Sequence, residues 1–289
     1  MVNLEKLLGQ LQNPTAMDEI TLARVKETRE LEPRRRCFAD HSGIQAAKQN
    51  GTKSFSVKFK ETILPIYEAM TGFQLKHSIQ FWNYWHRIGD DDELAKIQDW
   101  ESSQGSRVFL RDCLSLSIAL GINFVDNQSH QHTELGELEH QAKQQQNKEA
   151  IKSLAKRCAE TINELPFYKG ADFIAAVPPR PGKEFDLPSW VAKLVSVVTG
   201  KPDITSNFSF GNTKASVKEV ALEEKWAAWE AADLKVNGID LAGKKVILID
   251  DKYQSGTTIQ FVGMVLQKFG ASEVYGLSLV KTLRDTDNQ

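Results

Sequence analysis

The sequence predicts an α/β fold: a parallel sheet with helices on both faces, preceded by a mostly helical N-terminal region. Three observations favour it. Short strand patterns recur in the C-terminal half, at residues 172–177, 245–249 and 273–280. Segments with helical character separate them, and strands that alternate with helices are typical of a doubly wound parallel sheet. Before residue 128, apolar residues recur mainly at helical spacing.

The composition is that of an ordinary globular chain. Its 289 residues, 41% hydrophobic and 26% charged, are enough for two modest domains with real cores. The net charge of −2 does not indicate binding to nucleic acid, although a local basic patch would permit it. We expect no membrane segment, because no apolar run approaches about 20 residues. Three widely separated cysteines and the lack of a signal peptide predict a reduced, cytoplasmic protein.

Helices are expected through most of the first 128 residues. The periodicity places them at residues 4–31 (interrupted at Asn13-Pro14), 63–70, 79–88 and 108–120. One alternating run, residues 54–59, predicts a half-buried strand.

Several polar and aromatic groups in this region allow two interpretations. Asp90, Asp91 and Asp92 run straight into a helix and are expected to cap it rather than to bind a metal. The dense aromatic residues between 81 and 85 could form a base-stacking platform. Because no basic residues interleave with the rings, we expect packing in a core or an interface instead. The short run of arginines at residues 34–36 is expected to form a solvated turn.

A polar segment at residues 126–131 predicts the boundary between an accessory region of unknown function, residues 1–128, and a second domain, residues 129–289. His130 and His132 could bind a metal, but no third ligand stands in register, so a solvated linker is expected. The second domain should begin with one or two long helices across residues 133–164. Further helices are expected at 190–199, 216–232 and 257–269, the first of them ended by Gly200.

The segment from Val246 to Thr258 carries the chemistry. Four apolar residues predict a strand buried on both faces, and Asp250 and Asp251 follow at its carboxyl end, where open α/β sheets bind ligands. A short loop then opens onto a helix start, whose unpaired N–H groups attract anions. Gly256 permits close approach of the backbone. A phosphate beside two hydroxyl acceptors is the layout of a ribose 5-phosphate site.

The alternative is that the two aspartates only cap the following helix. One acid would suffice for a cap, and two adjacent carboxylates repel each other unless a ligand or a metal offsets the repulsion. The number and the position of the acids therefore favour a binding site.

This segment resembles the PRPP (5-phosphoribosyl 1-pyrophosphate) signature of type I phosphoribosyltransferases, and within them it is most similar to ComF-like proteins. The resemblance extends upstream through Thr133–Gly136 with Ala142-Lys143, Phe173–Pro179, and Thr213–Trp226. It implies that Asp250 and Asp251 are the catalytic residues, which hold the ribose hydroxyls and act by electrostatics and positioning, with Mg²⁺ bound through the substrate or water.

The resemblance also implies two loops that bind phosphate groups. The 5-phosphate loop would comprise Lys252, Tyr253, Gln254, Ser255, Gly256, Thr257 and Thr258. The pyrophosphate loop would comprise Pro179, Arg180, Pro181, Gly182 and Lys183, of which Arg180 and Lys183 supply positive charge.

The sequence departs from the family pattern at two loop positions and at its N-terminus. Lys252 replaces an apolar residue and either reinforces phosphate binding or pairs with Asp251; Gln254 replaces a small hydroxyl residue. The cysteines of a zinc ribbon are missing. The implied function is transfer of a phosphoribosyl group to an unidentified acceptor. The alternative is a non-catalytic PRPP or nucleotide sensor, or an accessory protein in DNA uptake or processing. A homodimer is a further expectation, with Trp226 and Trp229 as candidate interface residues.

Overall fold

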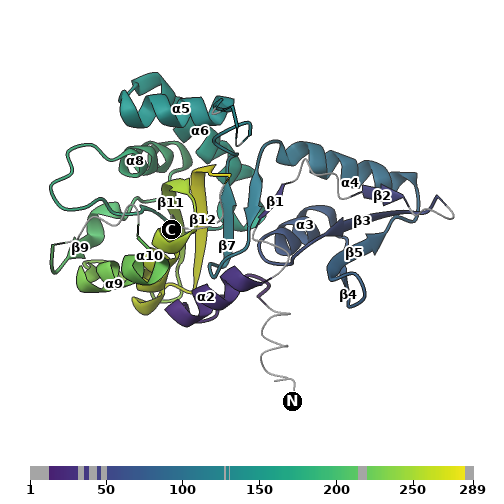
Figure 1. Cartoon of the computed structure of the whole chain (residues 1–289), viewed down its shortest axis with the longest axis horizontal. Helices are drawn as coiled ribbons and strands as arrows, with labels where there is room; N and C mark the ends of the chain where they lie inside the picture. Colours follow the sequence, from purple (N-terminus) through teal and green to yellow (C-terminus); the bar gives the residue numbers. More distant parts are fainter. Residues whose placement is uncertain are drawn as a thin grey trace, which may run out of the picture.

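The computed structural model describes residues 13–31, 36–38, 44–46, 51–126, 128–129, 131–213 and 220–283. At its centre lies a six-stranded sheet of order β1-β6-β7-β12-β11-β8 (Figure 1). The strands are β1 (Arg36–Phe38), β6 (Val108–Leu110), β7 (Leu116–Ala119), β8 (Phe173–Ala176), β11 (Lys245–Tyr253) and β12 (Glu273–Lys281). Strands β7, β12, β11 and β8 run parallel, while β6 pairs antiparallel with β7 and β1 pairs antiparallel with β6.

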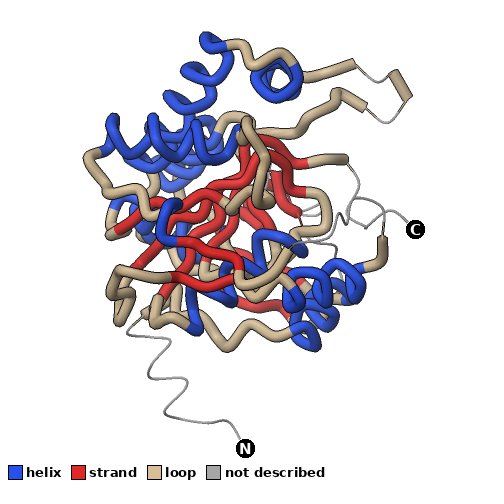
Figure 2. The backbone as a smooth tube through the Cα atoms, turned by 90° about the vertical axis from the view of Figure 1, so that its left-hand side faces the viewer, coloured by secondary structure: helices blue, strands red, loops and turns tan. Residues whose placement is uncertain are grey.

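Helices cover both faces of this sheet (Figures 1 and 2). One face carries α5 (Glu134–Gln144), α6 (Lys148–Glu164), α7 (Pro166–Lys169) and α8 (Leu187–Thr199), and the other carries α2 (Leu22–Glu30), α9 (Leu222–Ala231) and α10 (Thr257–Lys268). Alternate side chains of β11 divide between the two cores: Ile247 and Ile249 face α6 and α8, whereas Val246 and Leu248 face α10. The predicted α/β fold with a parallel sheet between two helical layers is confirmed.

A second sheet, antiparallel and of order β2-β3-β5-β4, forms a lobe beside the central one. Its strands are β2 (Ile44–Ala46), β3 (Lys53–Val57), β4 (Lys76–Ser78) and β5 (Asn83–Arg87), and it packs against α3 (Ile63–Thr71) and α4 (Asp91–Gln104). The Phe55 ring stacks on Tyr67 with centroids 4.5 Å apart, and Trp100 meets Tyr67 edge-on at 5.0 Å. A small antiparallel pair, β9 (Phe208–Phe210) and β10 (Leu234–Val236), follows a 3₁₀ turn at Thr205–Asn207.

The prediction of a mostly helical N-terminal region is wrong for the residues that the structure describes. Residues 79–88 form the turn of a hairpin and its second strand β5, and residues 108–120 contain β6 and β7 rather than a helix. Short apolar runs do not distinguish a buried strand from a buried helix, and β7 pairs with β12, a partner more than 150 residues away along the chain. The division at residue 128 stays a prediction; the central sheet continues across it.

Local signals were more reliable where a cap or a turn decides the structure. Asp90 caps α4, its Oδ1 accepting a hydrogen bond from the Glu93 backbone N at 2.8 Å, as predicted. Gly200 ends α8 in the left-handed conformation, also as predicted. Arg34, Arg35 and His130 lie outside the described residues.

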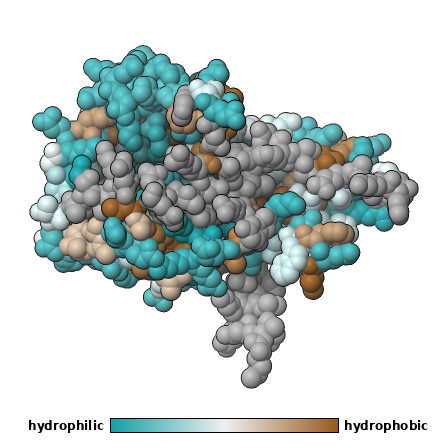
Figure 3. All heavy atoms as spheres, viewed as in Figure 1, coloured by the Kyte–Doolittle hydropathy of each residue, from teal (hydrophilic) through white to brown (hydrophobic). Residues whose placement is uncertain are grey.

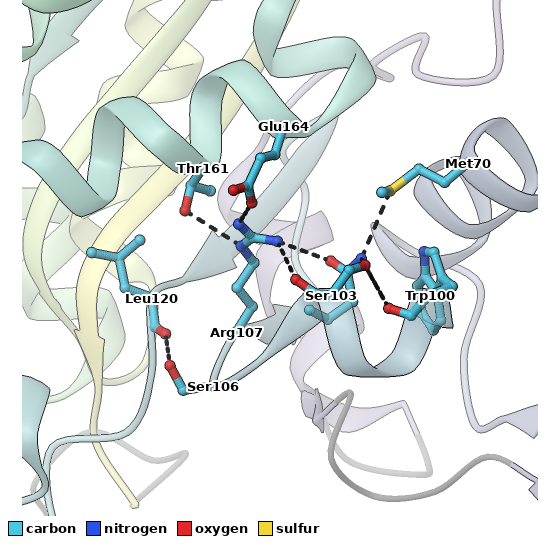
Figure 4. A network of polar contacts seen from close by, with 9 residues as sticks. Met70, Trp100, Ser103, Ser106, Arg107, Leu120, Thr161 and Glu164 are labelled. Carbon is cyan, nitrogen blue, oxygen red and sulfur yellow. Dashed lines mark hydrogen bonds and ion pairs between the residues drawn. The ribbon is translucent and has the colours of Figure 1, made fainter. Parts of the chain in front are cut away.

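Arg107 joins the lobe to the helical layer (Figure 4). It follows α4 and precedes β6, and its Nε donates to Thr161 Oγ1 at 3.3 Å. Its Nη1 donates to the Ser103 carbonyl at 3.2 Å, and its Nη2 pairs with Glu164. The guanidinium therefore links α4 with α6. None of the described helices combines the length and apolar character needed to cross a membrane.

Candidate functional site

A cleft of about 540 Å³ opens at the carboxyl ends of β8 and β11. Its walls come from the loops that follow these two strands, from the end of α5, and from the first turns of α8 and α10. Eleven of the predicted site residues line it: Pro179, Arg180, Lys183, Asp250, Asp251, Lys252, Gln254, Ser255, Gly256, Thr257 and Thr258. The fold thus brings two segments about 70 residues apart in sequence to one cavity.

The loop between β11 and α10 has the geometry of an anion cradle. Gly256 has φ 74° and stands at the helix N-cap, where no side chain caps the first N–H groups. A Cβ at Gly256 would collide with the Tyr253 ring, so this turn requires glycine for two separate reasons. The Ser255 and Thr257 hydroxyl oxygens are 3.0 Å apart. Free helix N–H groups with two adjacent hydroxyls suit a phosphate.

Three predicted loop residues do not line the cleft. Tyr253 is only 2% exposed, and its hydroxyl donates to Asp112 Oδ2 at 3.0 Å. Its ring lies in the same core as Val246 and Leu248. Tyr253 therefore supports the turn and does not contact a ligand. Pro181 and Gly182 also lie outside the lining, at the tip of the loop after β8.

The two aspartates of β11 have different surroundings. Asp250 is 9% exposed, and burial together with the neighbouring Asp251 raises its pKa to about 8. Its Oδ1 accepts a hydrogen bond from the Asp251 backbone N at 2.9 Å. Asp251 is paired with a cation: its Oδ2 lies 2.7 Å from Lys143 Nζ. Burial and the adjacent carboxylate therefore favour the protonated form of Asp250 at neutral pH.

Lys143 and Glu139 on α5 are functional candidates that sequence reasoning did not single out. Lys143 Nζ lies 3.7 Å from Glu139 Oε1, and Glu139 Oε2 lies 3.3 Å from Lys252 Nζ. Burial alone would lower the pKa of Lys143, but the Asp251 and Glu139 carboxylates raise it above its usual value. The i,i+4 spacing of Glu139 and Lys143 was visible in the sequence, yet nothing there showed that α5 faces the end of β11.

This network corrects one expectation about Lys252. The sequence suggested that Lys252 either reinforces phosphate binding or pairs with Asp251. In the structure Lys143 pairs with Asp251, while Lys252 pairs with the nearly buried Glu139. Alternating charges thus run from Asp251 through Lys143 and Glu139 to Lys252.

The loop after β8 is anchored at both of its ends. The Val177 backbone N donates to the Ile249 carbonyl at 2.8 Å, and the Lys183 backbone N donates to the Arg180 carbonyl at 3.2 Å. Lys183 Nζ lies 2.8 Å from Asp186 Oδ1, and Asp186 also caps α8. The loop therefore presents Arg180 and Lys183 to the cleft beside a helix start.

The remaining wall contains α9, through Lys225 and Trp229. Trp226 and Trp229 are each only 1% exposed and pack on the Phe261 ring, with centroids 5.0 and 5.5 Å away. The expectation that these tryptophans form an interface between subunits is therefore wrong. Tryptophans in a surface segment suggested an interface, but they belong to the core beneath α9.

The acidic side chains fit a Mg²⁺ ion only in part. Within the described residues, no group of three or more histidine, cysteine or acidic side chains could hold a metal by itself. Mg²⁺ commonly binds through one or two carboxylates together with phosphate oxygens of a substrate. Asp250 and Asp251 suit that shared arrangement.

No protein-family model matches the chain, and no curated protein matches it. Among solved structures, adenine phosphoribosyltransferase from Leishmania tarentolae has a TM-score of 0.36 and 12% identity, over 58% of this chain and 91% of that one. Glutamine PRPP amidotransferase from B. subtilis has a TM-score of 0.35 and 16% identity, over 96% and 59%. PRPP synthetase from Mycobacterium smegmatis has a TM-score of 0.28 and 19% identity, over 43% of this chain and only 33% of the synthetase. Similarities this weak establish no family membership.

Proposed function

We propose that the cleft binds PRPP and that the protein transfers its phosphoribosyl group to an acceptor with release of pyrophosphate. One observation carries the proposal. The Asp250–Asp251 pair, the phosphate-type turn at Gly256 and the basic loop at Arg180 and Lys183 all line one cleft. They supply hydroxyl acceptors, an anion cradle and a second cationic site, which are the three recognition elements that PRPP requires.

The ligand is oriented by these elements. Its 5-phosphate would bind the backbone and hydroxyl groups of residues 254–258, at the positive end of α10. Its ribose hydroxyls would donate to carboxyl oxygens of Asp250 and Asp251. Its pyrophosphate would then extend toward Arg180 and Lys183, where cations stabilise negative charge. The sequence resemblance to type I phosphoribosyltransferases, and to ComF-like proteins within them, supports the same assignment.

The reaction is a displacement at the anomeric carbon. A lone pair of the acceptor forms the new bond to this carbon while the carbon–oxygen bond to pyrophosphate breaks, and the bonding electrons leave with pyrophosphate. The acceptor then loses its proton to water. Positive charge builds up on the ribose ring, and Asp251 stabilises it electrostatically. Bound Mg²⁺ would neutralise pyrophosphate, and Arg180 and Lys183 supplement it.

Ligand binding is tested by thermal unfolding. PRPP with Mg²⁺ should raise the Tm of the full chain, because a ligand that binds only the folded state stabilises it. Asp250→Ala combined with Asp251→Ala should abolish the shift. The matched control is Asp91→Asn with Asp92→Asn, which removes two adjacent exposed carboxylates from α4 and should leave the shift intact. An undiminished shift in the Asp250/Asp251 variant would refute the site.

Catalysis needs a separate measurement, because a non-catalytic sensor would bind PRPP equally well. The ion pairs of Asp251 and Lys252 with α5 favour the sensor in one respect, since binding could be signalled through this helix. Pyrophosphate release should be followed with PRPP and a panel of nucleobases and amines. Release that depends on the acceptor supports the transferase, and none across the panel, from protein that binds PRPP, supports the sensor.

A further inference from the structure

The outer face of the β3-β5-β4 sheet has an unusual set of side chains. Phe55 and Val57 of β3 are buried against α3 and α4, so the residues that alternate with them point outward. The strand register places Tyr84 opposite Val57 and His86 opposite Phe55, which leaves Trp85 on the outer face of β5. The outward residues of the three strands are Ser54, Ser56, Lys76, Ser78, Asn83, Trp85 and Arg87.

Cations surround the ring at the centre of this face. Trp85 lies directly opposite Lys76 of β4 and opposite Ser56 of β3. Arg87 follows two positions along β5, and Lys58 lies in the bend directly after β3. Lys58, Lys76 and Arg87 are all exposed, and none of them has an ion-pair partner in the part of the chain that the structure describes. None of the outward residues that the structure describes on these three strands is a carboxylate.

The aromatic surface continues beyond the sheet to the turn between β4 and β5. Phe81 is 68% and Trp82 is 71% exposed, and Trp82 adopts a positive φ of 48°. A bulky residue is strained in this conformation, and here its indole ring is exposed. Figure 3 shows hydrophobic side chains beside hydrophilic ones at the lower end of this lobe. Large exposed rings without an intramolecular role indicate a binding surface.

We propose that this face, termed the outer lobe face, binds single-stranded nucleic acid. A sheet face with an exposed ring, neighbouring cations and hydroxyl or amide groups offers stacking to bases and counter-charge to phosphates. Exposed cations on a face whose described outward residues include no carboxylate complement a polyanion. A lipid surface would suit the apolar tip alone, but it would leave the sheet face with Ser54, Ser56 and Asn83 unexplained. The net charge of the whole chain does not reveal this face. Lys76 lies next to the Trp85 ring through cross-strand pairing and not through proximity in sequence.

The test uses the full chain and a fluorescein-labelled oligothymidylate, with fluorescence anisotropy at low and moderate salt. Wild-type protein should bind, with an affinity that falls as salt rises. Trp85→Ala should weaken binding about fivefold or more, through loss of one stacked base. Lys76→Gln with Arg87→Gln should lower the slope of log affinity against log salt by about 1.4, because each phosphate contact on a single strand contributes about 0.7.

The matched control is Trp190→Ala with Lys193→Gln. Trp190 on α8 is 49% exposed, with Lys193 Nζ 6.0 Å from its ring centroid, so this variant removes a comparable ring and cation far from the lobe. This variant should bind the oligonucleotide with the affinity of the wild type. Excess PRPP should displace no oligonucleotide from the wild-type protein. Circular dichroism verifies that each variant is folded. If Trp85→Ala does not fold, the salt dependence of Lys76→Gln with Arg87→Gln tests the proposal.

Three results would overturn the proposal. The first is no binding by the wild-type chain at low salt. The second is an equal loss of affinity in the control variant, or displacement by PRPP, which would place the oligonucleotide elsewhere. The third is binding to vesicles of anionic phospholipid without binding to the oligonucleotide, which would assign the lobe to a membrane surface.

Discussion

At the residue scale, Asp250 shows what a sequence can and cannot predict about a site. Its place after a buried strand was predictable, because a run of apolar residues followed by two acids marks the strand end. The protonation of Asp250 was not predictable, because its raised pKa depends on burial and on the charge of the neighbouring Asp251. The ammonium that neutralises Asp251 comes from Lys143, more than 100 residues away in sequence.

The pKa of Asp250 predicts a pH dependence of stability. An unfolded aspartate releases its proton near pH 4, whereas folded Asp250 retains its proton up to about pH 8. Between these values the folded chain binds more protons, so its free energy of unfolding should fall as pH rises and should level off above pH 8. Asp250→Asn should remove this decline. Between pH 5 and pH 8 the free energy of unfolding of the variant should rise relative to that of the wild type by on the order of 3 kcal/mol.

Urea unfolding at several pH values measures this difference. Asp92→Asn, at an exposed position of α4, is the control and should parallel wild type across the same interval. Parallel curves for Asp250→Asn and wild type would mean that Asp250 is ionised in the folded chain at neutral pH.

At the element scale, α5 decides how the cleft is closed. The sequence predicted a helix here, and Thr133 caps it by accepting a hydrogen bond from the Gly136 backbone N at 3.0 Å. Its orientation was not predictable, because it depends on Gly136 lying against the backbone of Asn123. Strands β6 and β7 were predicted as a helix for the same reason. Pairing with a distant strand determines their structure, and local periodicity carries no information about that partner.

Gly136→Ala should act at a distance on the cleft. The added Cβ would collide with the Asn123 carbonyl and push α5 outward, so Lys143 would withdraw from Asp251. We expect a loss of stability of about 1–3 kcal/mol from the forced shift. The PRPP-induced rise in Tm should also become smaller. Thermal unfolding with and without PRPP measures both effects.

Gly170→Ala is the matched control for this change. Gly170 has a negative φ, and a Cβ there would make only ordinary contacts with the Phe167 carbonyl. It should leave both the Tm and its PRPP dependence nearly unchanged. An equal PRPP response in Gly136→Ala and wild type would exclude α5 as part of the binding site.

At the scale of the whole molecule, the central sheet joins regions that the sequence appeared to separate. A polar stretch near residue 128 indicated a boundary, but β7 lies before it and pairs with β12 after it. The apolar runs of β8, β11 and β12 predicted their strands correctly because burial on both faces leaves a continuous pattern. In the antiparallel lobe the alternating run at residues 54–59 predicted β3 correctly. The other lobe strands escaped prediction because they are short and the turn between β4 and β5 is apolar.

A chain truncated to residues 129–289 should fail to fold cooperatively. It would lack β6 and β7, so that the edge of β12 and the apolar surface beneath Ile118 would be exposed. A chain of residues 105–289 retains both strands and should recover a cooperative thermal transition. Equal transitions in the two chains, followed by circular dichroism, would support the division at residue 128 as a domain boundary.

The order of strands also has a consequence for synthesis. Of the described strands, β12 is the last to be made, and it occupies the middle of the sheet between β7 and β11. During synthesis, β7 and β11 therefore each have one edge without a hydrogen-bonded partner until β12 leaves the ribosome. Unpaired strand edges can pair with other nascent chains, so we expect the incomplete chain to be prone to aggregation until β12 has been translated.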